Sequence, residues 1–134
     1  MIVPNRTTVA VADGHALRLF RNKAHEPGIE LVALPEPDIE VGNQGSGTRH
    51  HSSAANPDGA RLREDNFAAA AAAYLNRQVL SGGIEKLVVI ADPRTLGEMR
   101  RHFHDALVPK MVGELAKNLS DHDVKAIEAA LGRA

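Results

Sequence analysis

Adjacent histidines are the first side chains in this sequence with the chemistry to bind a metal ion or to act as a base. His50 and His51 would point to opposite faces of a strand, and in a loop they would need a third ligand that the sequence does not show. His102 and His104 lie two residues apart on a predicted helix, whereas a metalloprotease helix carries its histidines four apart. We therefore expect solvated histidines and no zinc site.

Two carboxylates, Asp13 and Asp92, each follow a predicted strand. Brought together, they are candidate ligands for Mg²⁺, which a metal-dependent nuclease uses to activate water. Asp13 also suits a hairpin turn, and Asp92 suits a helix N-cap. The structural roles are the simpler interpretation, and a metal-dependent nuclease stays open as an alternative function.

Several arginines are candidates for a basic patch that would bind RNA phosphates. They are Arg49, Arg61, Arg63, Arg94, Arg100 and Arg101, of which Arg61 and Arg63 are the candidate phosphate contacts. Acidic residues such as Glu64 and Asp65 stand among them, which favours a solvated surface with salt bridges. Both interpretations stay open.

The composition is typical of one folded domain, expected over residues 1–134, with 43% hydrophobic and 25% charged residues. A formal net charge of -1 gives no chain-wide field for binding polyanions. Cysteine is absent, which excludes disulfides, thiolate zinc sites and cysteine nucleophiles. The sequence shows no signal peptide and no apolar run long enough to span a bilayer, so it predicts a cytoplasmic protein without a cofactor or membrane contact.

The first predicted elements are antiparallel strands. Thr7–Ala12 and His15–Phe20 flank Asp13-Gly14, a pair that favours a two-residue turn with positive φ at both positions. A third strand is expected over Glu30–Leu34, ended by Pro35. The chain therefore begins as a three-stranded meander.

A long stretch rich in Pro, Gly, Ser and Asn follows, from about residue 35 to residue 60. A loop of this length inside a compact domain is typically functional or disordered. We therefore take it as the candidate binding loop. Its candidate binding residues are Gly42, Asn43, Gln44, Gly45, Arg49, His50 and His51.

A helix and a buried strand are predicted next. Helical spacing of apolar residues covers Arg61–Leu80, and the alanine run Ala68–Ala73 allows close packing. Gly82-Gly83 closes this helix. The run Lys86–Ala91 is expected to be the central strand, because it is apolar without alternation and so suits burial on both faces.

The C-terminal part is predicted as helix, short strand and helix. Asp92-Pro93 begins a helix whose apolar residues Leu96, Met99, Phe103 and Leu107 run on to Pro109. Met111–Ala116 is a short strand, and Ser120–Asp123 resembles a capping box before the last helix. The order of elements predicts an α/β fold, with a ribonuclease-H-like mixed sheet, an antiparallel N-terminal meander and helices packed on the sheet.

Four segments resemble the bacterial host attachment protein family, described as "protein required for attachment to host cells". They are Val9–Gly14, Glu64–Ala68, Ala91–Arg100 and Val112–Ser120, spread over nearly the whole chain apart from the loop. That family is similar to the middle domain of archaeal and eukaryotic peptide release factors. The resemblance implies a ribonuclease-H-like fold, and it implies function only weakly.

Such release factors carry a Gly-Gly-Gln loop that enters the ribosome and promotes hydrolysis of peptidyl-tRNA. Gly42-Asn43-Gln44 lies in the equivalent stretch here, and asparagine tolerates left-handed φ better than other non-glycine residues. Gln44 nevertheless lies well before Phe67, whereas the release-factor motif almost abuts its helix. The resemblance implies a binding or regulatory protein, with the ribosome, RNA or an unknown protein as partner. Peptidyl-tRNA hydrolysis by Gln44 is the alternative.

Overall fold

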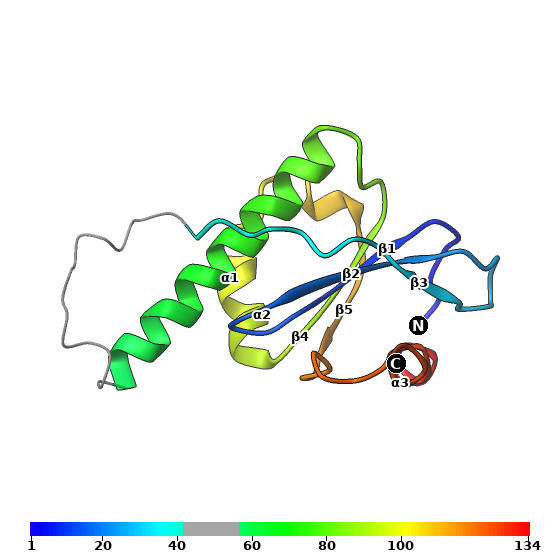
Figure 1. Ribbon diagram of the computed structural model, residues 1–134. Helices are drawn as coiled ribbons and strands as arrows, with labels where there is room; N and C mark the ends of the chain where they lie inside the picture. Colours follow the sequence, from blue (N-terminus) through cyan, green and yellow to red (C-terminus); the bar gives the residue numbers. More distant parts are fainter. Residues whose placement is uncertain (42–56) are drawn as a thin grey trace.

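The computed structural model describes residues 1–41 and 57–134, and it has the mixed α/β architecture that the sequence predicts (Figure 1). Its strands are β1 (Thr8–Ala12), β2 (Leu17–Asn22), β3 (Leu31–Ala33), β4 (Leu87–Ala91) and β5 (Met111–Ala116). Its helices are α1 (Pro57–Leu80), α2 (Pro93–Arg100), the short 3-10 helix η3 (Val108–Lys110) and α3 (Val124–Arg133).

The strands form one sheet in the order β3-β2-β1-β4-β5. The N-terminal meander is confirmed, since β1, β2 and β3 pair antiparallel, whereas β1, β4 and β5 pair parallel. This arrangement is compatible with a ribonuclease-H-like fold. The middle strand is β1, and the prediction that β4 is central was wrong. Both strands are buried along their whole length, so an apolar run does not distinguish the middle strand from its neighbour.

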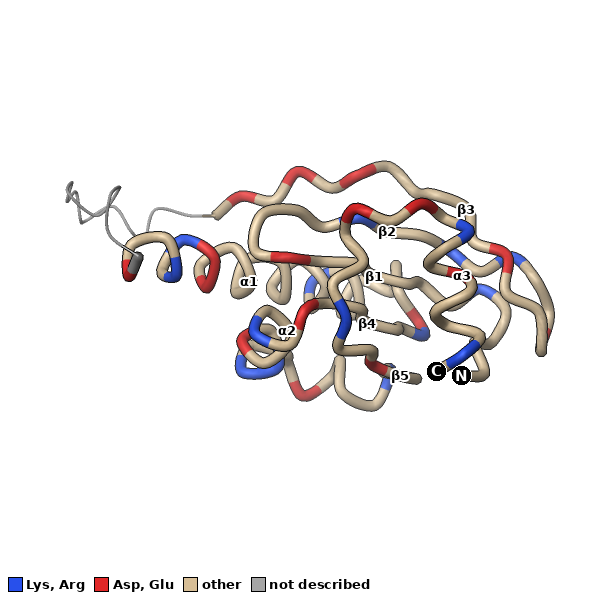
Figure 2. The backbone as a smooth tube through the Cα atoms, turned by 90° about the horizontal axis from the view of Figure 1, so that it is seen from below, with Lys and Arg blue, Asp and Glu red and all other residues tan. Residues whose placement is uncertain are grey.

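Helices cover both faces of the sheet (Figure 1). Alternate side chains of β1 point to opposite faces, as strand geometry requires. Ala10 and Ala12 pack with α1 and α2, and the fully buried Ala71 and Ala72 bring α1 close to the sheet. Val9 and Val11 pack with α3 on the other face. The chain ends lie side by side, and the Met1 ammonium donates hydrogen bonds to the backbone oxygens of Leu131 and Ala134 (Figure 2).

The turn between β1 and β2 differs from the prediction. Ala12 pairs with Leu17, so the connection has four residues, and Gly14 does not have positive φ. The Asp13 carboxylate instead accepts hydrogen bonds of 2.7 Å from the backbone N–H groups of both His15 and Ala16. The side chain of Asp13 thereby shapes the turn, as aspartate commonly does in turns.

Helix α1 begins at Pro57, so the predicted loop boundary at residue 60 was too late. Proline suits this first position because its φ is already helical and its missing N–H would have no partner there. The predicted end at Gly82-Gly83 is confirmed. Gly82 has φ +87°, and the N–H groups of Gly83 and Ile84 both donate to the carbonyl of Gln78.

Helix α2 begins as predicted, with Oδ2 of Asp92 accepting a hydrogen bond of 3.2 Å from the Thr95 N–H. It ends at Arg100, however, and not near Pro109. Asn76 of α1 supplies the physical reason, because its amide donates to the His102 carbonyl at 2.9 Å and accepts from the His104 N–H at 2.8 Å. A side chain on another helix thus takes backbone groups that a longer helix would use.

The predicted strand Met111–Ala116 is confirmed as β5. The capping box before α3 is not. Asp123 is the N-cap, and its Oδ1 accepts a hydrogen bond of 2.9 Å from the Ala126 N–H. Ser120 lies outside this cap, and its hydroxyl contacts Asp13 instead.

Candidate functional site

The carboxyl ends of β1 and β4 lie together at one edge of the sheet. The two strands are parallel with Ala12 opposite Ala91, so Asp13 and Asp92 follow the sheet at the same edge. Ligands of open α/β sheets generally bind at this edge. The first half of α1 crosses the same end of the molecule (Figure 1).

Asp13 is held by hydrogen bonds from two sides. The Ser120 hydroxyl donates to Oδ2 at 2.7 Å, and the turn N–H groups of His15 and Ala16 donate to Oδ1. Burial by itself would raise the pKa of Asp13, but the hydrogen bonds from Ser120, His15 and Ala16 outweigh burial and hold that pKa below its ordinary value. Asp13 is therefore ionised at neutral pH and accepts three hydrogen bonds from the protein.

Asp92 caps α2 by accepting a hydrogen bond from the Thr95 N–H. Asp13 and Asp92 therefore both accept hydrogen bonds from backbone N–H groups. Over the two ranges that the structure describes, no three His, Asp or Glu side chains come close enough together to hold a metal ion. His102 contacts Glu98 at 3.2 Å, and Nδ1 of His104 accepts a hydrogen bond from the Ala106 N–H at 2.9 Å. The two predicted structural roles, turn and helix cap, are therefore the contacts that Asp13 and Asp92 make in the described part of the chain.

A hollow of about 300 Å³ opens beside Asp13, and we call it the edge pocket. It is formed by the β1–β2 turn, the residue before the segment 42–56, and the first half of α1. Its lining residues are Gly14, His15, Val41, Arg63, Asn66 and Phe67.

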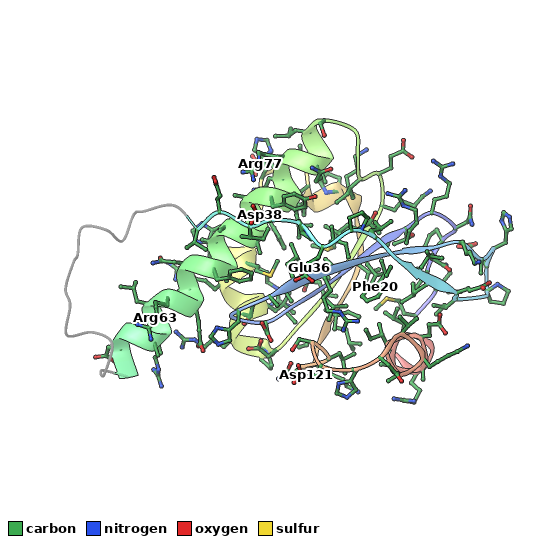
Figure 3. All side chains as sticks on the ribbon, in the orientation of Figure 1. Phe20, Glu36, Asp38, Arg63, Arg77 and Asp121 are labelled. Carbon is green, nitrogen blue, oxygen red and sulfur yellow. The ribbon has the colours of Figure 1, made fainter. Side chains whose placement is uncertain are left out.

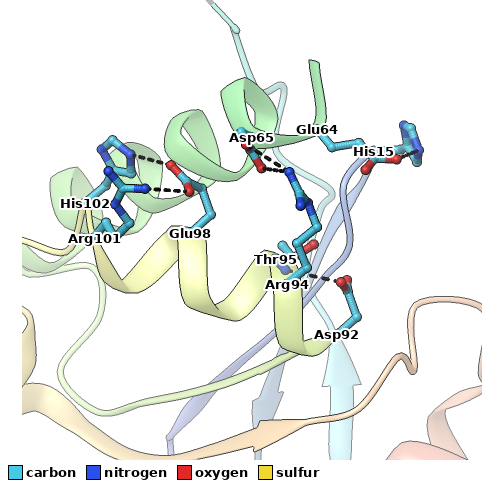
Figure 4. A network of polar contacts seen from close by, with 9 residues as sticks. All are labelled: His15, Glu64, Asp65, Asp92, Arg94, Thr95, Glu98, Arg101 and His102. Carbon is cyan, nitrogen blue, oxygen red and sulfur yellow. Dashed lines mark hydrogen bonds and ion pairs between the residues drawn. The ribbon is translucent and has the colours of Figure 1, made fainter. Parts of the chain in front are cut away.

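Charge and aromatic surface meet in the edge pocket. Nε2 of His15 lies 3.3 Å from a carboxylate oxygen of Glu64 (Figure 4). Arg63 is exposed and projects from the first half of α1 (Figure 3), and Phe67 is half-buried one helical turn further on. Within residues 1–41 and 57–134, neither the Arg63 guanidinium nor the Asn66 amide has a hydrogen bond or ion pair. Both groups are open to a ligand.

Most of the other candidate arginines have acidic partners. Arg94 donates two hydrogen bonds of 3.0 Å to the Asp65 carboxylate and so joins α2 to α1 (Figure 4). Arg100 lies 2.6 Å from Glu114, and Arg101 lies 3.4 Å from Glu98. The exposed Arg61 and Arg63 are the candidates without such a partner among the described residues.

The candidate binding loop is described over residues 35–41, and Val41 at the end of this part lines the edge pocket. Gly42, Asn43, Gln44, Gly45, Arg49, His50 and His51 all lie outside the described residues. The edge pocket was not foreseen from the sequence. Its only signals were Asp13-Gly14 and the segment Glu64–Phe67, and nothing in the sequence shows that these lie together.

The fold and the edge site define an α/β domain with a mixed sheet, helices on both faces and an open pocket at the carboxyl ends of its strands. Comparison with protein families matches residues 6–131 to Bacterial archaeo-eukaryotic release factor family 12. The chain belongs to this family, and the expected relation to release-factor domains is confirmed. No curated protein matches the chain. Among the described residues, no helix has the length and apolar character to cross a membrane.

Proposed function

We propose that this protein acts in translation as a release-factor-like binding protein that contacts ribosomal or transfer RNA through the edge pocket. The family match over residues 6–131 supports a role in translation. The observation that carries the proposal is Arg63, which has no partner among residues 1–41 and 57–134, beside the half-buried Phe67 in a pocket of about 300 Å³.

Arg63 and Phe67 are side chains of the types that bind unpaired nucleotides. Proteins bind single-stranded RNA by stacking bases on aromatic rings and by pairing arginine with phosphate. Phe67 offers the ring, Arg63 offers the charge, and the Asn66 amide offers hydrogen bonds to a base edge. Arg61 lies outside the lining of the pocket and adds an exposed positive charge to the same part of α1. Glu36 and Asp38 lie in the segment after β3 (Figure 3), whereas Arg63 projects from α1, so in this proposal the phosphate binds on the α1 side of the pocket.

The test is cosedimentation of the purified full chain with bacterial ribosomes at low and moderate salt. The double variant Arg61→Gln with Arg63→Gln removes both guanidinium groups from the first half of α1. The control is Arg133→Gln, which removes an exposed charge from α3 on the other face of the sheet. Wild type and control should pellet with ribosomes, and the double variant should remain in the supernatant at moderate salt. Equal pelleting of all three proteins would refute the proposal.

The candidate binding loop gives a second, enzymatic hypothesis. Gly42-Asn43-Gln44 follows Val41, which lines the edge pocket, and the family relation supports comparison with the release-factor glutamine. In this hypothesis Gln44 promotes hydrolysis of peptidyl-tRNA. Peptide release from stalled ribosomes should then be lost in Gln44→Ala while cosedimentation is retained. Release that is absent from wild type, or equal in both proteins, would remove the hypothesis.

The same role in translation implies a cytoplasmic protein, and we propose that any effect on attachment to host cells is indirect. The resemblance to the host attachment family motivates this proposal. Fractionation of cells should find the chain with ribosomes, and the double variant of Arg61 and Arg63 should lose any attachment phenotype together with ribosome binding. An attachment phenotype that persists in this variant would contradict an indirect effect.

A further inference from the structure

Two further hollows lie near the start of β1, at the opposite end of this strand from the edge pocket. One has a volume of about 80 Å³ and the other about 230 Å³. Both are lined by Thr8, Arg21 and Gly83, so they adjoin, and we call them together the arginine groove. Its lining includes residues from the start of β1 and from the end of α1. Its size approaches the roughly 300 Å³ at which small-molecule pockets begin.

Two arginines form the charged end of the arginine groove. Arg21 is half-buried and pairs with Thr8 across β1 and β2, and Arg6 precedes β1 with φ +72°. In the part of the chain that the structure describes, neither guanidinium has a hydrogen bond or ion pair. Two guanidinium groups offer planar forks of donors, which match the several oxygens of a phosphate better than one fork does.

The charged end of the arginine groove has more basic than acidic side chains. Glu85 lines the same hollow as Arg6 and Arg21 and is the acidic side chain found there. At the C-terminal end of α1, the backbone carbonyls of Gln78 and Val79 accept hydrogen bonds. The donors are the N–H groups of Gly82, Gly83 and Ile84. Among the described residues, this hollow is therefore lined by two arginines and one carboxylate.

The other end of the arginine groove is apolar, with one aromatic ring and one amide. Leu19, Leu34 and Ile84 line it together with Tyr74 and Gln78. Gly83 leaves room for the amide, since a β-carbon there would lie 2.6 Å from Oε1 of Gln78. Neither the Tyr74 hydroxyl nor the Gln78 amide has a hydrogen-bond partner among the described residues. A flat group with a hydrogen-bonding edge suits this lining.

We propose that the arginine groove binds a nucleoside monophosphate, with the phosphate on Arg6 and Arg21 and the base between Tyr74, Ile84 and the Gln78 amide. The phosphate has the charge and shape for two guanidinium groups, and the base is flat with a polar edge. A free mononucleotide and the 5′-phosphorylated end of an RNA share this chemistry.

The experiment is calorimetric titration of the full chain with AMP, with adenosine and inorganic phosphate as half-ligands. AMP should bind more tightly than either half. Arg21→Gln should weaken AMP binding about tenfold, because it removes a charge-assisted contact. Glu85→Gln should strengthen it, because the opposing charge is gone. Arg133→Gln should leave it unchanged, and circular dichroism checks that each variant is folded.

Two outcomes would overturn the proposal: no heat with AMP at millimolar concentration, or equal AMP affinity in wild type and Arg21→Gln. A 5′-phosphorylated adenosine pentanucleotide and its unphosphorylated form distinguish the two sources of the ligand. Tighter binding of the phosphorylated pentanucleotide than of AMP identifies an RNA end, and tighter binding of AMP identifies the free nucleotide. The double variant of Arg61 and Arg63 should bind AMP normally, so this site and the edge pocket are tested separately.

Discussion

The Ser120 hydroxyl lies 2.7 Å from Oδ2 of Asp13 and joins the segment after β5 to the turn after β1. The turn donates to the same carboxylate through the N–H groups of His15 and Ala16. These bonds couple the wall of the edge pocket to the distant C-terminal part of the chain. They also make the stability of the protein depend on the charge of one side chain.

Removal of the Ser120 hydroxyl should weaken the fold at neutral pH and reduce its sensitivity to acid. Ser120→Ala should lower the free energy of unfolding by about 1 kcal/mol at pH 7, because the donor to a charged group is lost. The pKa of Asp13 in the folded protein lies below its ordinary value of 3.8, so its contribution is full above that pH and is lost as the pH falls through the folded pKa. Urea unfolding at neutral and acidic pH measures both effects.

Asp13→Asn is the matched control for this prediction. The amide cannot ionise, so the acid-dependent part of the stability should be absent from this variant. Ser120→Ala should lie between wild type and Asp13→Asn in its loss of stability with falling pH. If Ser120→Ala and wild type lose equal stability on acidification, Ser120 does not lower the pKa of Asp13.

Gly14 is required by a close approach and not by its backbone angle. A β-carbon at this position would lie 2.7 Å from Cγ and 2.9 Å from Cβ of Glu64 on α1. Gly14→Ala should therefore cost about 1 to 3 kcal/mol, the usual range for overpacking. Gly97→Ala in α2 is the control, because no atom lies within 4 Å of its added carbon and alanine favours helix. Thermal unfolding should separate the variants, with Gly97→Ala at or above wild type.

Local signals made part of the fold predictable from sequence. The Asp92 cap, the Gly82-Gly83 helix end and the three-stranded meander depend on neighbouring residues, and the structure has all three. The end of α2 depends on Asn76, which lies far away in the sequence, so apolar spacing wrongly extended that helix to Pro109. Local pattern does not reveal a competing partner on another element.

The same limit applies to the two candidate sites. The positions of Asp13 and Asp92 at strand ends followed from the sequence, and parallel pairing brings them to one edge. The edge pocket needs α1 to lie against the β1–β2 turn, and the arginine groove needs Arg6 and Arg21 to meet residues that follow α1. These contacts join segments that are distant in the chain, and one sequence carries no record of their pairing.

Asn76 should be the side chain that fixes the turn after α2. Asn76→Ala removes both its hydrogen bond to the His102 carbonyl and its bond from the His104 N–H, which should cost about 1 to 3 kcal/mol. Asn76→Asp keeps an acceptor for His104 and loses the donor to His102, so its stability should lie between alanine and wild type. Hydrogen exchange of the His104 amide reports the local effect. An unchanged exchange rate in Asn76→Ala would show that this bond does not hold the turn.

Arg6 adopts a backbone conformation that favours glycine. Substitutions of Arg6 can therefore distinguish an effect on stability from an effect on ligand binding. Its φ of +72° costs an ordinary residue roughly 1 to 2 kcal/mol. Arg6→Gly should therefore raise the free energy of unfolding by about 1 kcal/mol, whereas Arg6→Ala removes the same guanidinium and keeps the strain. Both variants should bind AMP more weakly than wild type, because both lack one of the two phosphate contacts. Higher stability in Arg6→Gly alone, together with weaker binding in both, would mean that the chain retains a strained arginine for its ligand. Equal stability in the two variants would show that the left-handed conformation of residue 6 does not destabilise the protein. Undiminished AMP binding would show that Arg6 does not contact the ligand.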